Sequence, residues 1–352
     1  MEYGAEVDSG AWEDAEVLQR LAGRMCLGVG REVPNAVVMG DLGWWTVRAR
    51  REYLRLAFWG KVVREQKGGM VREVYEEGRR RIVRGVAGKK EWCVETRRLL
   101  EKVGLGDLWE TEEVGSERGW KALVRGVMQE REELRWRQGM VGKTTLERYM
   151  RIKTTLRKEW FLSERRVVVK RWVRLRASGS CLAVSVGRRR GVKREDRVCG
   201  WCSQDVVEDE DHFLDECRKW RGRRGKMWDE MRIGDKTMVK RIEGCGREER
   251  VDWMLRGGSS VRTRAVLVRW VVEMLFEREK KGTGKRGSER WGEKMTSLEK
   301  SRMAAEVAGR MAMRAGRIER VRMRGIVRAA AKGAAAAALA AGGDCAGYES
   351  CV

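Results

Sequence analysis

The chain has 352 residues, a formal net charge of +24 and a sequence pI of about 10.1. Charged residues make up 37% of it, and no run of about 18 uncharged apolar residues occurs, which excludes a transmembrane protein. The 16 tryptophans and the many valines, leucines and methionines suffice for a core, which argues against a wholly disordered chain. The excess of basic residues indicates a polyanionic partner, and nucleic acid is the most common one.

The amino-acid usage is skewed beyond its charge. Pro34, Asn35 and His212 are the only residues of their kinds, whereas Trp, Met, Gly, Val, Arg, Glu and Lys are abundant. Because the abundant residues have guanine-rich codons, we infer a compositional bias in the gene, and such a bias by itself raises the number of basic residues. The net charge alone therefore does not identify nucleic acid as the partner.

Targeting signals and cysteine spacing bear on the compartment. The N-terminal stretch is acidic and lacks the basic and apolar regions of a signal peptide. The nine cysteines are spaced irregularly in a long chain, so we expect no disulfide framework. These features predict an intracellular protein, nuclear or cytoplasmic, that is not secreted and has no membrane partner.

Apolar residues recur at helical spacing along most of the chain, so we expect it to be mainly helical. A turn around Gly28, Gly30 and Pro34 follows the first helix, and Thr46 is placed to cap the second. From the N-terminus, the predicted helices are residues 12–27, 46–66, 70–86, 91–103, 116–137 and 143–158. Four tryptophans at helical spacing are expected in the core: Trp59, Trp136, Trp160 and Trp172.

The second half of the chain has less regular patterns. Residues 162–176 are basic and valine-rich and fit a helix or a strand, and Ser163 as a cap favours the helix. Residues 180–198 indicate a loop or a short strand. Two further helices are expected, near residues 212–230 and 247–281.

The strongest local signal is the stretch CGWCSQDVVEDEDHFLDEC. Cys199 and Cys202 are separated by two residues, and His212 and Cys217 follow. Three thiolates and an imidazole form a closed four-ligand set of the structural Zn²⁺ type, with no position left for a reacting water. His212 and Cys217 are about 140° apart around an ideal helix, so we expect a helix end or a distortion between them. The alternative is a set of buried thiols beside a surface histidine.

The predicted fold is therefore mainly α, with bundle-like helical segments around a small Cys₃His zinc knuckle. A low-complexity tail, rich in basic residues and alanine, follows the helices. The chain divides into a disordered N-terminus, a helical region, the zinc-knuckle region, C-terminal helices and a loosely ordered tail, at residues 1–11, 12–178, 179–230, 231–281 and 282–352.

The cysteine cluster and its flanks resemble the zinc-binding region downstream of the reverse transcriptase domain in non-LTR (LINE-type) retrotransposon polyproteins. The residues that carry this resemblance are Gly187, Arg188, Glu195, Asp196, Arg197, Cys199, Cys202, Glu208, Asp209, Glu210, His212, Phe213, Leu214 and Cys217. Upstream, residues 37–64 with their Gly-Asp-Leu-Gly-Trp motif, residues 91–110 and residues 146–162 are similar to segments of the same elements. The resemblance covers roughly residues 15–280 and implies a region that helps a reverse transcriptase to hold template RNA or target DNA.

The catalytic groups of such polyproteins are missing from this chain. A polymerase needs paired carboxylates for two Mg²⁺ ions, and no Asp-Asp pair occurs here. His212 is the only histidine, and no proline follows Pro34, so neither type of associated nuclease site can be assembled. We therefore expect no catalytic residue and no activity of the chain on its own. The run from Gly142 to Thr145 lacks the first glycine of a phosphate loop, so we interpret it as a helix start capped by Thr144 or Thr145, without a nucleotide site.

A basic run adjoins the cluster and carries the nucleic-acid hypothesis. Trp201, inside the cluster, either stacks on a base or packs against the zinc site. The acidic run at residues 208–211 would repel phosphate, so nucleic acid should approach from the basic side. The alternative for the basic run is a solvated face. The residues predicted to neutralise phosphates of RNA or DNA, with little reading of sequence, are Arg188, Arg189, Arg190, Lys193, Arg194 and Arg197.

Three functional hypotheses follow from the sequence. The first is a retrotransposon-derived protein with a zinc-ordered nucleic-acid-binding region. The second is an interaction module in which zinc only staples helices together, and binding that weakens steeply with salt would separate it from the first. The third is the remnant of a decayed element without selected function, which the skewed composition keeps open. A stably folded, zinc-loaded product would count against the third.

Overall fold

The computed structural model describes residues 12–65 and 68–282. Within these ranges the chain is helical and forms no strand, and its β pairing is a single antiparallel bridge between Val198 and Val207. The mainly α fold predicted from the sequence is confirmed. The predictions for residues 1–11 and for the tail at 282–352 lie outside the described residues, with the exception of Gly282. No helix in the described part is long and apolar enough to cross a membrane.

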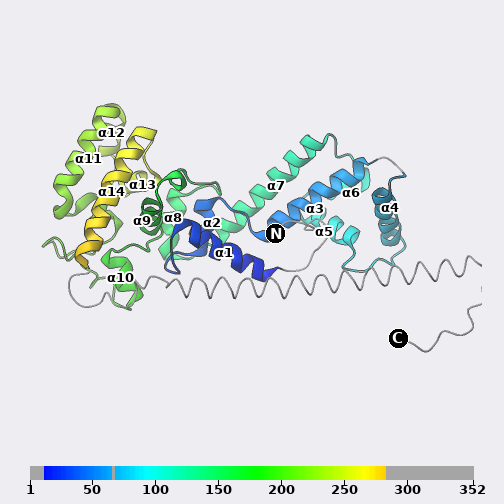
Figure 1. Ribbon diagram of the computed structural model, residues 1–352, viewed down its shortest axis with the longest axis horizontal. Helices are drawn as coiled ribbons and strands as arrows, with labels where there is room; N and C mark the ends of the chain where they lie inside the picture. The colour runs from blue at the N-terminus through cyan, green and yellow to red at the C-terminus, as the bar shows by residue number, and fades with distance from the viewer. Residues whose placement is uncertain (1–11, 66–67, 283–352) are drawn as a thin grey trace, which may run out of the picture. The chain divides into compact units, whose positions relative to one another are not determined.

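The helices that agree best with the sequence are the long amphipathic ones. In α3 the predicted cap is present, because the Thr46 side chain accepts a hydrogen bond from the Ala49 amide at 3.2 Å. Figure 1 shows the helices in chain order. They are α1 (Glu13–Leu27), α2 (Asn35–Leu42), α3 (Val47–Arg64), α4 (Met70–Val83), α5 (Trp92–Lys102), α6 (Leu108–Thr111), α7 (Glu117–Gln138), α8 (Glu147–Ile152), α9 (Arg166–Arg176), α10 (Ala183–Arg189), α11 (Arg221–Gly234), α12 (Lys236–Glu243), α13 (Arg247–Arg256) and α14 (Val261–Gly282).

Several short elements differ from the prediction in the first half. Helix α2 follows the expected turn directly, with Pro34 at its N-cap, and it was missed because its apolar residues are not confined to one face. The helix expected over 143–158 is reduced to α8 after a short 3₁₀ turn, and neither Thr144 nor Thr145 caps it. Helix α9 begins at Arg166 without a side-chain cap, so the predicted cap at Ser163 is wrong.

The second half holds three further corrections. Residues 180–198 contain α10 rather than only a loop or strand, and the amide of Ala183 at its start donates to the Glu208 carboxylate at 2.7 Å. Helix α12 lies between the two helices expected there. The single helix expected over 247–281 is divided into α13 and α14, because Gly257 and Gly258 adopt left-handed φ angles of +93° and +70°.

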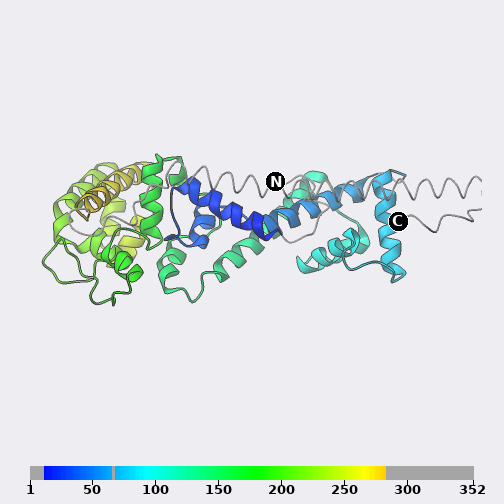
Figure 2. The ribbon, with the colours of Figure 1, turned by 60° about the horizontal axis from the view of Figure 1, so that its bottom comes forward.

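Two clusters of buried apolar side chains form the core. One lies among α3, α4, α5, α6 and α7 and is centred on Trp59 and Trp120, whose rings are 5.3 Å apart. The other joins α1, α2, the C-terminal end of α7 and the elements from α8 to α14, and it includes Trp136 and Trp172. Of the four tryptophans expected in the core, Trp160 alone is only partly buried. Figures 1 and 2 show α3 running beside α7, its main packing partner.

The crossing of α3 and α7 depends on a glycine. A Cβ at Gly60 would overlap the buried indole of Trp120, which is held in place by a 2.8 Å hydrogen bond from its Nε1 to the Leu56 carbonyl. We expect Gly60→Ala to destabilise the protein by about 1–3 kcal/mol through overpacking. Gly126, on an exposed face of α7 with nothing within 4 Å, is the matched control, and Gly126→Ala should stabilise by up to about 1 kcal/mol through helix propensity. Urea unfolding of both variants measures the difference, and equal effects would contradict it.

A buried network of charged groups joins α2, α8 and α9. Asp41 accepts a hydrogen bond from the Tyr149 hydroxyl at 2.8 Å and lies 3.2 Å from Arg176. Glu159 lies 3.3 Å from the same guanidinium and 2.7 Å from the Lys153 ammonium. Burial raises the pKa of Asp41 to about 6 against the opposing effect of Arg176. The Gly-Asp-Leu-Gly-Trp motif thus supplies a structural ion pair.

Candidate metal centre

Four side chains predicted to bind a metal converge in the structure. The ligand atoms of Cys199, Cys202, His212 and Cys217 all lie within 4.8 Å of one another. The sulfurs of Cys199 and Cys217 are 3.9 Å apart, and Cys202 Sγ is 3.3 Å from His212 Nε2. A tetrahedral metal with bonds of about 2.3 Å to sulfur holds two sulfurs about 3.8 Å apart. The spacing therefore fits a single tetrahedral metal ion.

The first two ligands are presented by a tight turn. The amide of Cys199 donates to the Val206 carbonyl at 2.8 Å, and the amide of Glu208 donates to the Arg197 carbonyl at 3.0 Å. These bonds flank the Val198–Val207 bridge and close a small hairpin-like loop. Backbone amides of Trp201 and Cys202 point to the Cys199 sulfur, which favours its thiolate form.

The other two ligands are brought together by a widened helical turn. His212–Glu216 form one turn of π-helix, and the amide of Cys217 donates to the His212 carbonyl at 2.7 Å. A π turn closes on the fifth residue, so residues five apart face the same side. The distortion expected from the spacing of His212 and Cys217 is therefore confirmed. At the start of this turn, the His212 amide donates a hydrogen bond to the Asp209 carboxylate at 3.0 Å.

Burial sets the protonation of these groups before any metal binds. It raises the pKa of the Cys199 thiol to about 12 and raises the pKa of Cys217, whereas it lowers the pKa of His212. The imidazole is therefore neutral at pH 7, and a divalent cation would displace protons from the thiols. His212 Nδ1 lies 3.9 Å from Glu216 Oε2, a carboxylate of the kind that orients metal-binding imidazoles.

A buried ion pair lies directly behind the cluster. Both carboxylate oxygens of Glu208, which is 1% exposed, accept hydrogen bonds from Arg278 of α14 at 2.8 Å. Glu208 Oε1 is 3.9 Å from Cys199 Sγ, and Arg224 of α11 donates to the Cys217 carbonyl at 3.0 Å. Three thiolates with a divalent cation carry a net charge of −1, and these guanidiniums lie where they compensate it.

The basic residues predicted to contact phosphate differ in their surroundings. Arg188 donates to the Ser178 carbonyl at 2.6 Å and Arg197 to the Val192 carbonyl at 2.6 Å, so both hold their own loop. Arg194 is exposed and lies 3.1 Å from Asp209. The exposed members of the run are Arg189, Arg190, Lys193 and Arg194.

Trp201 packs on Trp220 beside the candidate metal centre. Its ring stacks on the buried Trp220 at 5.6 Å with an interplanar angle of 26°, and the Arg278 guanidinium lies 5.3 Å from its centroid. Lys219 approaches the same two rings at 6.0 Å. The ring has little free face, which favours packing over base stacking.

The acidic run at residues 208–211 is not the exposed negative patch expected from the sequence. Glu208 and Glu210 are buried, and Asp211 pairs with Arg148 of α8 at 2.5 Å. The run faces inward because its carboxylates meet partners from α8, α10 and α14, which are far away in the chain. It contributes to the attachment of the knuckle more than to its surface potential.

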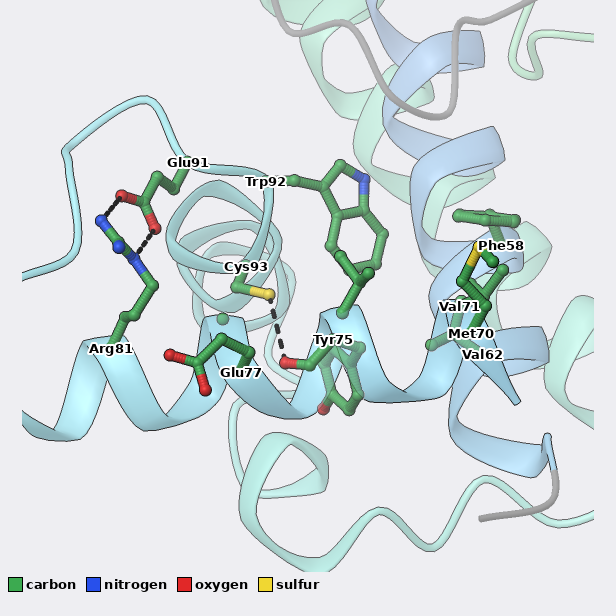
Figure 3. A pocket seen from close by; sticks show the side chains of 12 residues that line it. Phe58, Val62, Met70, Val71, Tyr75, Glu77, Arg81, Glu91, Trp92 and Cys93 are labelled. Carbon is green, nitrogen blue, oxygen red and sulfur yellow. Dashed lines mark hydrogen bonds and ion pairs between the residues drawn. The ribbon is translucent and has the colours of Figure 1, made fainter. Parts of the chain in front are cut away.

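A separate apolar cavity of about 590 Å³ lies among α3, α4 and α5 (Figure 3). Phe58, Val71 and Trp92 line it, and the Arg81–Glu91 ion pair stands at its edge. The Cys93 thiol faces the Tyr75 carbonyl at 3.7 Å. Burial raises the pKa of Cys93 to about 11, so this thiol is neutral and unreactive at pH 7.

Comparisons with known proteins return nothing. No protein-family model matches the chain, no curated protein matches it, and no solved structure matches it.

Proposed function

We propose that Cys199, Cys202, His212 and Cys217 bind one structural Zn²⁺ ion. The main support for this proposal is that three cysteine sulfurs and one histidine nitrogen lie within 4.8 Å of one another. Three sulfurs and one imidazole nitrogen suit Zn²⁺ better than Mg²⁺ or Ca²⁺, which prefer oxygen ligands. All four positions are filled by protein, so the ion orders the chain and takes no part in a reaction.

We further propose that residues 179–230 form a zinc-ordered module that binds RNA or DNA. The exposed cations of the basic run, Arg190 and Lys193 among them, lie on the loop that leads into the first two ligands. Such a loop contacts phosphates without reading bases. The resemblance to non-LTR retrotransposon polyproteins supports the same function: the chain would be a C-terminal portion that holds nucleic acid for a reverse transcriptase and lacks the polymerase carboxylates.

A second candidate function is a zinc staple without a nucleic-acid partner. It is favoured by the ion pairs that tie the knuckle to its neighbours. Glu208 pairs with Arg278 of α14, and Asp215 pairs with Arg250 of α13 at 2.7 Å. Either function requires the metal, so only binding measurements separate the two.

The test measures nucleic-acid binding across a salt series. Zinc-loaded wild type should bind single-stranded RNA or DNA, and the logarithm of its affinity should fall by about 0.7 per phosphate contact for each logarithmic unit of salt. Cys199→Ser/His212→Ala should bind at least about tenfold more weakly, whereas Cys26→Ser, at an exposed thiol outside the cluster, should bind as wild type does. Equal binding by wild type and the double variant would leave the staple as the function.

The basic loop has its own matched comparison. Arg190→Ala/Lys193→Ala should lower the salt slope by about 1.4, since two phosphate contacts are lost. Lys89→Ala/Lys90→Ala removes the same charge from an exposed turn elsewhere and should leave the slope unchanged. The same slope for both variants would show that only the total charge matters, which contradicts a specific role of the loop.

A further inference from the structure

A small cavity at the junction of α2, α3 and α7 combines aromatic rings with cations. Its volume is about 290 Å³, and the residues that line it are Gly43, Trp45, Arg50, Tyr53, Leu54 and Arg125. No carboxylate is among these six described residues. The cavity therefore has flat apolar walls and a positive potential. The basic loop at residues 188–197 does not offer both of these features together.

The two rings are held in a fixed arrangement. The centroids of Trp45 and Tyr53 are 6.1 Å apart at 81°, which makes an angular wall. Trp45 is anchored because its Nε1 donates to Gln129 Oε1 at 2.8 Å and its carbonyl accepts from Gln19 at 2.7 Å. Trp45 also packs against both hydrophobic clusters. The ring is rigid at one edge and open to the cavity at another.

The cation is placed above one of these rings. The guanidinium of Arg125, an exposed residue of α7, lies 5.4 Å from the Tyr53 centroid, and its Nη2 is 3.4 Å from the Tyr53 hydroxyl. Arg50 of α3 lines the same cavity. The two guanidiniums would repel a cationic ligand. A purely apolar ligand would remove water from both guanidiniums without giving them a partner, which costs free energy.

The chemistry that fits is a flat ring that carries an anionic group. The volume is at the lower limit for small-molecule sites, which suits one base and not a larger ring system. We propose that this cavity binds one nucleotide of a single-stranded nucleic acid: its base stacks on Tyr53 and Trp45, and its phosphate contacts Arg125 and Arg50. This inference rests on the proposed nucleic-acid function and assigns to it the aromatic platform that Trp201, whose ring is stacked on Trp220, does not provide.

The test separates the ring from the charge. Full-length zinc-loaded protein is titrated with a labelled 12-nucleotide oligouridylate and with an abasic strand of the same length and charge. Tyr53→Leu should weaken binding of the oligouridylate about 5- to 150-fold, the range that one stacked base provides, and should leave binding of the abasic strand unchanged. Tyr53→Phe keeps the ring and should bind the oligouridylate within about twofold of wild type.

Arg125 has a matched control on its own helix. Arg118 is exposed on α7 and does not line the cavity. Arg125→Ala should weaken oligouridylate binding at least about fivefold more than Arg118→Ala, although both remove one charge. In wild type, 4-thiouridine placed in the strand should crosslink on irradiation to Trp45 or Tyr53, and mass spectrometry identifies the crosslinked residue. This measurement uses wild-type protein alone, so it does not depend on the folding of a variant.

The outcomes are distinct for the two proposals. If wild type binds neither strand, the proposed function and this inference both fail. If wild type binds but Tyr53→Leu and Arg125→Ala bind like their controls, or the crosslink maps only to the basic loop, the inference alone is overturned. Loss of oligouridylate binding in Tyr53→Leu, with its thermal unfolding midpoint unchanged, supports it.

Discussion

Chelation of the metal from wild-type protein is expected to unfold residues 199–217 locally. The hydrophobic cluster formed by helices α3 to α7 should stay folded. The loop from Cys199 to Cys217 has few regular backbone bonds beyond one bridge and one π turn, so its order depends on the ion. Structural Zn²⁺ sites in small peptides have apparent binding free energies of about 10–16 kcal/mol, which is available to folding. Amide hydrogen exchange, followed by mass spectrometry with and without chelator, should show a large loss of protection in residues 183–217.

The same experiment contains its internal reference. Amides near Leu56, Val62 and Val124 belong to the other hydrophobic cluster and should keep their protection after chelation. Restoring Zn²⁺ should restore protection around the metal centre, and Cys26→Ser should behave as wild type does. Unchanged exchange in residues 183–217 after complete metal removal would contradict a structural ion.

Replacement of Arg176 by methionine is expected to be among the most destabilising single changes in the core. Arg176 is 1% exposed, and its guanidinium lies between Asp41 at 3.2 Å and Glu159 at 3.3 Å. Its removal leaves the buried Asp41 carboxylate without its cation, while Glu159 keeps Lys153 at 2.7 Å, and breaking a buried ion pair costs about 3–5 kcal/mol. Urea unfolding of Arg176→Met against wild type measures the loss.

Two variants control this prediction. Arg174 lies on the same helix, is partly exposed and pairs with Glu32 at 3.3 Å, so Arg174→Met should cost about 1 kcal/mol or less. The double variant Asp41→Asn/Arg176→Met should be less destabilised than the two single effects added together, because the groups share one network. Additive effects, or equal losses for Arg174 and Arg176, would refute the coupling.

The elements predicted correctly are those whose signal is local. Helices α1, α3, α4, α5 and α7 are 11 to 22 residues long and carry apolar residues at helical spacing, so their periodicity is visible in the chain itself. The distortion between His212 and Cys217 follows from helix geometry alone, since two ligands of one ion must face the same side. The cysteine spacing indicates a metal site for a similar reason.

The elements predicted wrongly are stabilised by distant partners. Helix α10 begins at Ala183, whose amide is bonded to Glu208, 25 residues later. Helix α8 is short, and its Arg148 pairs with Asp211, 63 residues later, and with Asp252 of α13. The sequence predicts that the acidic run repels phosphate, although Glu208 pairs with Arg278 of α14 and Asp211 pairs with Arg148 of α8.

The sequence by itself determined the helical class of the protein, the four side chains of its candidate metal centre and its excess of positive charge, because each depends on residue type and short spacing. Only the tertiary structure decided which charges are available. It buries Glu208 against Arg278 and covers Trp201, and it brings Tyr53 of α3 beside Arg125 of α7, 72 residues away. The physical reason is that burial and ion pairing depend on packing between helices, and the pattern along one helix does not contain the identity of its partner.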